Sequence, residues 1–183
     1  RAASATRRDR PVGDRARTMR ALTELGDAEL SSLVQELGGK PFQARQVGHW
    51  LWKHGAATYA ELANVPTSLR AALAKSGPVR STTVAKADLA ADGTEKLLIR
   101  LHDEQAVECV IIPDGERTTL CVSTQVGCPV RCVFCASGMF GVRRNLSAGE
   151  IVEQVLHARS RLPGDRRLTN LVVMGMGEPM LNL

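Results

Sequence analysis

The sequence predicts an α/β protein in which a small helical domain precedes several β-strands and the start of a βα arrangement. Three observations predict it. Apolar residues recur at helical spacing before residue 78, segments rich in Val, Ile, Leu and Thr follow, and a strand–loop–helix–strand order comes last. We therefore divide the 183 residues into an Arg-rich leader at 1–21, a helical domain at 22–78, and the strands with the βα segment at 79–183.

The leader accounts for the net charge of +5. Seven arginines in residues 1–20 face two aspartates, and the rest of the chain holds equal numbers of basic and acidic side chains. A segment of this composition without hydrophobic periodicity is expected to be disordered. It could strengthen contact with RNA by counterion release, although a solvated leader is the simpler interpretation.

Composition excludes several classes of protein. The apolar fraction of 44% is ordinary for a globular domain. No apolar run is long enough to span a bilayer, and the N-terminus lacks the apolar segment of a secretory signal. Five cysteines, an odd number with local clustering, argue against a disulfide framework. We expect a cytoplasmic protein without membrane contact, whose cysteines serve metal or redox chemistry.

Three helices are expected in the helical domain. The first is capped by Asp27 and ends at the glycines 38–39, the second covers about 43–55, and the third follows Pro66. Their apolar faces are formed by residues at helical spacing: Leu30, Leu33, Val34, Leu37, Val47, Trp50, Leu51, Leu69 and Leu73.

Strands are expected next, with turns at the Asp-Gly pairs 92–93 and 114–115. The four segments are rich in β-branched and aliphatic residues: 80–87, 95–102, 106–112 and 118–125.

A helix and a strand follow the cysteines. Ser147 and Glu150 form a capping box for a helix that continues to about Arg161. A buried strand at 171–174 then ends in the Gly-Met-Gly-Glu-Pro loop at 175–179. Because one such unit cannot close a barrel, we expect the chain to be the N-terminal piece of a longer protein.

The spacing of Cys128, Cys132 and Cys135, C-x3-C-x2-C, predicts an iron–sulfur site. Three thiolates on one loop can bind three irons of a [4Fe–4S] cluster and leave the fourth iron open to a small molecule. Two alternatives are a structural zinc ion, with Cys121 as the fourth ligand, and three buried cysteines without a ligand.

The position of these cysteines favours a functional site. They follow an apolar strand at 118–123, and sites in α/β proteins form at the carboxyl ends of strands. Phe134 could shield a cluster or contact a ligand, or it could be a core residue. The loop at 175–179 offers backbone groups and one carboxylate to an amino acid's ammonium group, although alone it would be only a Gly/Pro turn.

Together these segments resemble the RlmN/Cfr family of radical S-adenosylmethionine RNA methyltransferases, on its RlmN side. The resemblance extends over about residues 22–183. It is carried by six stretches: 40–47, Trp50, 107–113, 121–135, 144–146 and 175–182.

The resemblance implies a fold and two cofactors. Residues 79–183 would be a β-hairpin segment and the incomplete start of a radical S-adenosylmethionine barrel. Cys128, Cys132 and Cys135 would bind the [4Fe–4S] cluster, and Gly177 and Glu178 would help to hold S-adenosylmethionine.

The resemblance also implies a reaction, the methylation of C2 of an adenosine in 23S rRNA and in tRNA. Glu108 would be the proton acceptor. Cys121 would be the resolving cysteine, which forms a transient disulfide with a downstream methyl-carrying cysteine that this chain does not contain. The chain alone is therefore expected not to turn over. The helical domain would bind RNA, an electron-donor protein would be a partner, and the protein would be a monomer.

Simpler interpretations of these residues stay open. Glu108 lies in an apolar strand, where a raised pKa is expected, or it faces outward. Cys121 could be a buried apolar cysteine, and Cys109 is expected in the core. Arg143 and Arg144 could meet phosphate or remain solvated. The rival functions are a Cfr-like C8 methyltransferase or another radical enzyme, and a zinc-binding RNA module without catalysis.

Overall fold

The computed structural model describes residues 20–139 and 141–182. The expected leader therefore lies outside the described residues, except for its last two. Both of these take part in the fold. Arg20 forms an ion pair with Glu29 at 2.6 Å, and Ala21 is buried.

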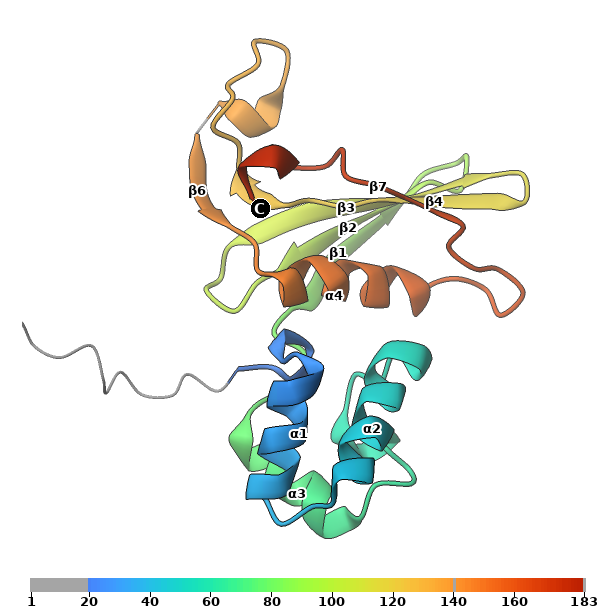
Figure 1. Cartoon of the computed structure of the whole chain (residues 1–183). Helices are drawn as coiled ribbons and strands as arrows, with labels where there is room; N and C mark the ends of the chain where they lie inside the picture. Colours follow the sequence, from blue (N-terminus) through green and yellow to red (C-terminus); the bar gives the residue numbers. More distant parts are fainter. Residues whose placement is uncertain (1–19, 140, 183) are drawn as a thin grey trace, which may run out of the picture.

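Helices make up the first part of the chain, drawn below the sheet in Figure 1. The elements in chain order are η1 (Leu22–Glu24), α1 (Asp27–Glu36), α2 (Pro41–His49), the π-helical turn η2 (Trp50–His54), η3 (Tyr59–Glu61) and α3 (Thr67–Ser76). The three expected helices are confirmed, and the expected end of the second at Gly55 is confirmed by its left-handed φ of +67°. The cap of α1 is Gly26, not Asp27, because the Gly26 N–H donates to the Glu29 carboxylate at 3.1 Å.

The expected apolar faces of these helices meet in one core. Val34, Val47, Leu51 and Leu73 are completely buried there, and Trp50 packs against them with part of its surface exposed. The burial of these side chains holds the three helices together, since apolar burial is the main favourable term in folding.

A five-stranded sheet and a two-stranded ribbon form the second part. The strands are β1 (Thr83–Leu89), β2 (Glu95–Arg100), β3 (Ala106–Asp114), β4 (Arg117–Cys121), β5 (Gln125–Gly127), β6 (Val142–Asn145) and β7 (Asn170–Val172). The sheet has the order β1-β2-β3-β4-β7, and β5 pairs with β6. The single strand expected at 118–125 is therefore wrong: the side chain and backbone of Ser123 are bonded to other elements, and the chain changes sheet there.

Helix α4 (Ala148–Arg159) covers one face of the sheet (Figure 1). Its capping box is confirmed: Glu150 N–H donates to Ser147 Oγ at 3.1 Å, and Ser147 N–H donates to the Glu150 carboxylate at 3.0 Å. Strands β4 and β7 are parallel and α4 connects them, so the predicted βα unit is present. The mixed α/β class is confirmed, but within the described residues this is the one parallel pair of an open sheet, and no barrel is formed.

The expectation of a buried strand at 171–174 is wrong. Leu171 is 53% exposed and Met174 is 81% exposed. The reason is topological, because β7 is the edge strand and is hydrogen-bonded to β4 alone. None of the helices in the described residues is long and apolar enough to cross a bilayer.

Polar side chains on α4 join the two parts of the molecule. The Glu153 carboxylate, fully buried, accepts hydrogen bonds from the backbone N–H groups of Ser81 and Thr82 at 2.8 and 2.7 Å, and from the Thr23 hydroxyl. Arg159 donates to the carbonyls of Trp52 and Lys53 at 2.9 and 2.8 Å.

A glycine on α4 permits a close approach between these parts. A Cβ atom on Gly149 would lie 2.5 Å from the carboxylate carbon of Glu24. The neighbouring Ser147 hydroxyl donates to that carboxylate at 2.6 Å. We call these contacts of α4 with residues 20–24, 52–53 and 80–82 the seam.

Candidate functional site

The three predicted ligand cysteines lie on one loop between β5 and β6, which we call the cysteine loop (residues 128–140). Its ends meet at two glycines with left-handed backbone, Gly127 with φ of +78° and Gly141 with φ of +69°. A Cβ atom on Gly127 would lie 2.0 Å from the Gly141 carbonyl oxygen, and Cys128 N–H donates to that oxygen at 3.2 Å. This close approach requires glycine at residue 127.

Backbone contacts shape the inside of the loop. Cys135 N–H donates to the Cys132 carbonyl at 3.0 Å, and a Cβ atom on Gly138 would lie 2.8 Å from the Cα of Arg131. Cys132 is exposed, whereas Cys128 and Cys135 are half-buried. Nowhere in residues 20–139 and 141–182 do three His, Cys, Asp or Glu side chains come close enough to hold a metal ion. The three cysteines therefore lie on one loop. That their thiols bind one iron–sulfur cluster stays a prediction.

Phe134 lies at the surface of this loop. Its side chain is 89% exposed, and that of the adjacent Val133 is fully exposed at 102%. The alternative that Phe134 is a core aromatic is therefore wrong. The role of Phe134 as a shield for a ligand stays a prediction.

The Gly-Met-Gly-Glu segment at 175–178, which we call the glycine loop, packs against residues 122–125. Gly175 N–H donates to the Val122 carbonyl at 3.0 Å, and Met176 accepts from Thr124 N–H at 2.8 Å. Glu178 N–H donates to the Gln125 side-chain carbonyl at 2.9 Å. Residues 122–125 lead directly into β5 and the cysteine loop, so the structure places the two predicted loops next to each other. Figure 1 shows them at the same end of the sheet.

Two observations at the glycine loop fit a bound ligand. Gly177 has φ of +107°, and a Cβ atom there would lie 2.7 Å from both Gln125 N and Thr124 Oγ1, so only glycine keeps this backbone close. Its N–H donates to no other described residue. The Thr124 hydroxyl beside it is buried without a hydrogen-bond partner in the described part of the chain. An unpartnered buried hydroxyl is uncommon in native proteins, so a polar ligand at this loop would satisfy the Thr124 hydroxyl.

Glu108, the predicted proton acceptor, lies on β3. Its side chain is 45% exposed and its carboxylate pairs with Lys96 at 3.1 Å. The apolar environment expected from the sequence of this strand is therefore wrong. The neighbours Val107 and Cys109 point into the core, and Glu108 points to the other face of the sheet.

A serine links the backbone of Glu108 to the glycine loop. Ser123 Oγ donates to the Glu108 carbonyl at 2.6 Å and accepts from Met176 N–H at 2.8 Å. Ser123 is completely buried, and Gln154 of α4 bonds both its N–H and its carbonyl at 2.9 Å. Ser123 therefore forms hydrogen bonds with both the backbone of the predicted proton acceptor and the glycine loop.

The two cysteines outside the loop differ in environment. Cys121 is half-buried at the end of β4 and pairs in register with Val110, two residues from Glu108 on the same face of the sheet. The alternative of a fully buried Cys121 is therefore wrong. Cys109 is in the core as expected, and burial, together with the nearby Cys121, raises the pKa of its thiol to about 12. Such a thiol is a poor nucleophile at neutral pH.

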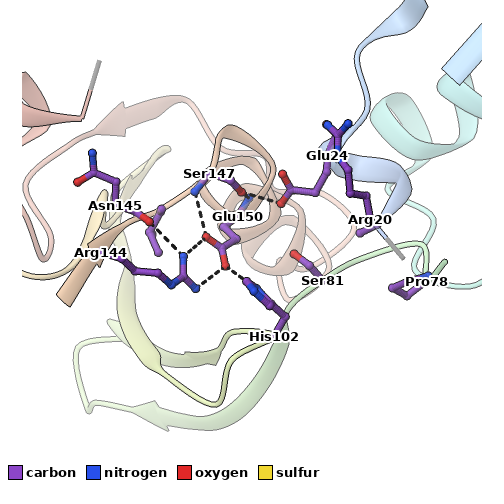
Figure 2. A pocket seen from close by; sticks show the side chains of 11 residues that line it. Arg20, Glu24, Pro78, Ser81, His102, Arg144, Asn145, Ser147 and Glu150 are labelled. Carbon is purple, nitrogen blue, oxygen red and sulfur yellow. Dashed lines mark hydrogen bonds and ion pairs between the residues drawn. The ribbon is translucent and has the colours of Figure 1, made fainter. Parts of the chain in front are cut away.

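Arg144 is held by acidic side chains and does not project into solvent. It donates to Glu150 at 2.7 and 2.8 Å and to Asp103 at 2.7 and 3.1 Å, and these bonds keep the pKa of Asp103 below its usual range. Figure 2 shows Arg144, Glu150 and His102 together on one side of a cleft of about 510 Å³ at the seam. The expectation that Arg144 meets phosphate is wrong in this structure, because its donors already face carboxylates. Arg143 remains exposed.

The sequence analysis missed the buried polar residues of α4: Glu150, Glu153, Gln154 and His157. All are at most 8% exposed. Their spacing could have revealed them, because positions 150, 153, 154 and 157 follow the spacing of a buried helix face.

Known proteins that are similar to this chain agree with the resemblance found in its sequence. Residues 21–79 match the family model described as the ribosomal RNA large subunit methyltransferase N-terminal domain. A probable dual-specificity RNA methyltransferase RlmN of Rhodopirellula baltica is 49% identical, with 85% of this chain and 42% of the relative covered. The dual-specificity RNA methyltransferase RlmN of Anaeromyxobacter sp. (strain Fw109-5) is 50% identical, with 84% and 42% covered.

A solved structure is similar as well. The radical SAM methyltransferase of Sphaerobacter thermophilus has a TM-score of 0.84 and 44% identity, with 88% of this chain and 48% of that chain covered. The chain thus spans less than half of the length of these relatives. Residues 21–79 thus match the N-terminal domain of the ribosomal RNA large subunit methyltransferases, and the chain as a whole is similar to a part of the RlmN proteins and of a radical SAM methyltransferase.

Proposed function

We propose that this chain carries the cofactor-binding part of an enzyme that methylates C2 of adenosine in 23S rRNA and in tRNA. One observation supports this most: a loop with three cysteines at C-x3-C-x2-C spacing lies beside a glycine loop whose Gly177 backbone has no partner among the described residues. The names of the relatives, dual-specificity RNA methyltransferase and radical SAM methyltransferase, agree with it.

Cys128, Cys132 and Cys135 would bind a [4Fe–4S] cluster through their thiolates. The donor set suits that cluster, because three thiolates leave one iron open, whereas structural zinc usually takes four protein ligands. When both cofactors are bound, they supply a 5′-deoxyadenosyl radical by reductive cleavage of S-adenosylmethionine. An adenine C2 is electron-poor and offers no lone pair, so a radical route is chemically reasonable.

Gly177 and Glu178 would hold the amino acid end of S-adenosylmethionine. The ammonium group can donate to the Gly177 carbonyl and to the Glu178 carboxylate, and the buried Thr124 hydroxyl lies next to both loops. Phe134 would cover the cluster from solvent. The exposed Phe134 ring is available for that contact.

Glu108 and Cys121 would serve the later steps. The half-exposed Glu108 carboxylate can accept a proton from substrate, and Lys96 holds it in place. Cys121, on the same face of the sheet, would resolve the product by a disulfide with a methyl-carrying cysteine that this chain lacks.

The wider assignments are part of the same proposal. The unit β4–α4–β7 would begin the radical S-adenosylmethionine barrel. The helical domain at 22–78 would bind RNA, an electron-donor protein would reduce the cluster, and the enzyme would act in the cytoplasm as a monomer.

Anaerobic reconstitution of this chain tests the proposal. We expect about four irons and four sulfides per chain, and a spectrum that changes when S-adenosylmethionine is added. The Cys132→Ala variant should lose the iron, and Cys109→Ala should keep it. Colourless protein with one zinc ion per chain would instead support the zinc-binding module. Mass analysis of adenosine methylated by a full-length relative distinguishes C2 from C8 chemistry.

A further inference from the structure

A groove of about 620 Å³ separates α1 from α2 in the helical domain. Figure 1 shows these two helices side by side. The groove lies outside the cysteine and glycine loops. It is lined by Asp27, Leu30, Ser31, Pro41, Ala44, Arg45, Gly48, His49, Trp52 and Lys53.

Basic side chains form one wall of this groove. Arg45, His49 and Lys53 follow one another at intervals of four residues, so they project from the same side of α2 and its π-helical turn. All three are exposed, and none pairs with an acidic side chain of the described residues. By contrast, Arg20 in the same domain is paired with Glu29.

One acidic side chain and two backbone carbonyls lie near these cations. Asp27, the one acidic residue that lines the groove, stands in the first turn of α1, where the free N–H groups of the helix stabilise a negative charge. The carbonyls of Trp52 and Lys53, near the end of the π-helical turn, accept from Arg159.

The groove also offers an aromatic and apolar surface. Trp52 lines it and is only partly buried, and Leu30 and Ala44 contribute apolar side chains. Gly48 lies between these side chains, and a Cβ atom there would meet Leu30 and Trp52 at an ordinary contact distance of 3.9 Å. Cations that alternate with an aromatic side chain suit an unpaired nucleic acid strand, whose phosphates and bases need both.

We propose that the groove between α1 and α2 binds a single-stranded or loop segment of RNA. Arg45 and Lys53 contact its phosphates, His49 donates a hydrogen bond, and Trp52 contacts a base. The inference rests on the proposed function and deepens it, because it names the surface through which the helical domain holds its substrate.

The affinity of the 183-residue chain for two probes tests this inference: an unmodified transfer RNA transcript and polyuridylate, each measured at several salt concentrations. The double variant Arg45→Gln/Lys53→Gln should bind about tenfold more weakly near 0.1 M salt, and the slope of log K against log salt should fall by about two. Trp52→Leu should weaken polyuridylate binding by about fivefold or more.

Matched controls separate this surface from general electrostatics. Lys75 is exposed on α3 outside the groove, so Lys75→Gln should leave affinity within about twofold, and Lys75→Gln/Lys86→Gln, with Lys86 exposed on β1, repeats the charge change of the double variant. Circular dichroism melting shows whether each variant is folded. Equal losses in the control and groove pairs would overturn the inference, as would a wild-type chain that binds neither probe.

Two further readouts complete the test. If polyglutamate competes as well as polyuridylate, the groove belongs to an acidic protein partner and the RNA inference fails. Iron content on the same preparations reports on the proposed function independently. If the chain binds no iron but the groove variants still lose RNA affinity, the proposed function is wrong and the assignment of the groove is supported.

Discussion

The seam and the cysteine loop are built in opposite ways. At the seam, the buried Glu153 carboxylate accepts hydrogen bonds from Ser81, Thr82 and Thr23, and Gly149 allows α4 to approach Glu24. In the cysteine loop, the backbone is closed by tight turns while Cys132 and Phe134 face outward. We therefore expect substitutions at the seam to lower the free energy of unfolding, and substitutions of exposed residues in the cysteine loop to change it little.

Glu153→Ala should have the largest effect among the substitutions at the seam. It leaves the N–H groups of Ser81 and Thr82 buried without acceptors, so we expect the free energy of unfolding to fall by about 3 kcal/mol. Urea denaturation at pH 7.5 measures it. Glu36→Ala, at an exposed position on α1, is the control and should change it by less than about 0.5 kcal/mol. Equal effects would show that the seam does not hold the parts together.

Gly149→Ala should cost about 0.5–1 kcal/mol, because the added methyl group makes the flexible Glu24 side chain move and lose the hydrogen bond from the Ser147 hydroxyl, while the higher helix propensity of alanine offsets part of that loss. Gly164→Ala is the matched control, since a Cβ atom at Gly164 would meet nothing within 4 Å. Thermal melting of both variants checks this. A melting temperature for Gly149→Ala equal to that of the control would contradict the close contact.

His157 should make the seam sensitive to mild acid. Burial, followed by the nearby Arg80, lowers its pKa below 6.5, so the folded protein favours the neutral ring. The contribution of His157 to stability is present above about pH 6.5, the ordinary pKa of a histidine in an unfolded chain. It is lost as the pH falls below that value, because the unfolded state takes up the proton first. Unfolding measured from pH 7.5 to 5.5 should show this slope, and His157→Gln should flatten it. An unchanged slope in the variant would assign it to other groups.

Phe134→Ala should have the smallest effect. Its ring is 89% exposed, so the free energy of unfolding should change by less than about 0.5 kcal/mol. Leu51→Ala, which removes a completely buried side chain, should cost about 2–5 kcal/mol in the same assay. A loss above about 2 kcal/mol for Phe134→Ala would mean that the loop is packed against the protein.

Local signals in the sequence predicted local structure well. The capping box of α4 depends on two residues three apart, Ser147 and Glu150. The end of the second helix depends on one glycine, Gly55, so both features could be located from the sequence alone. The partners of Glu150 and Glu153 could not, because Arg144 bends back across the helix start and Ser81 is 72 residues away from Glu153. The signal that could have indicated these contacts is the recurrence of polar residues at the spacing of a buried helix face.

Strand burial and side-chain environment were harder to predict. The apolar run at 171–174 has the composition of a buried strand, yet its burial depends on how many neighbours it has in the sheet. The apolar neighbours of Glu108 along the chain lie largely on the opposite face, and its actual neighbour Lys96 comes from another strand. The candidate site was therefore located by its motifs, while its electrostatics required the fold.

The glycine pair 127 and 141 at the base of the cysteine loop has a consequence for how such proteins can diverge. Since the two ends already touch, residues can be inserted or deleted between them without moving the strands on either side. Natural variants should therefore tolerate changes of length between Cys135 and Gly141, where the C-x3-C-x2-C spacing stays intact, whereas any side chain at residue 127 would force the ends apart.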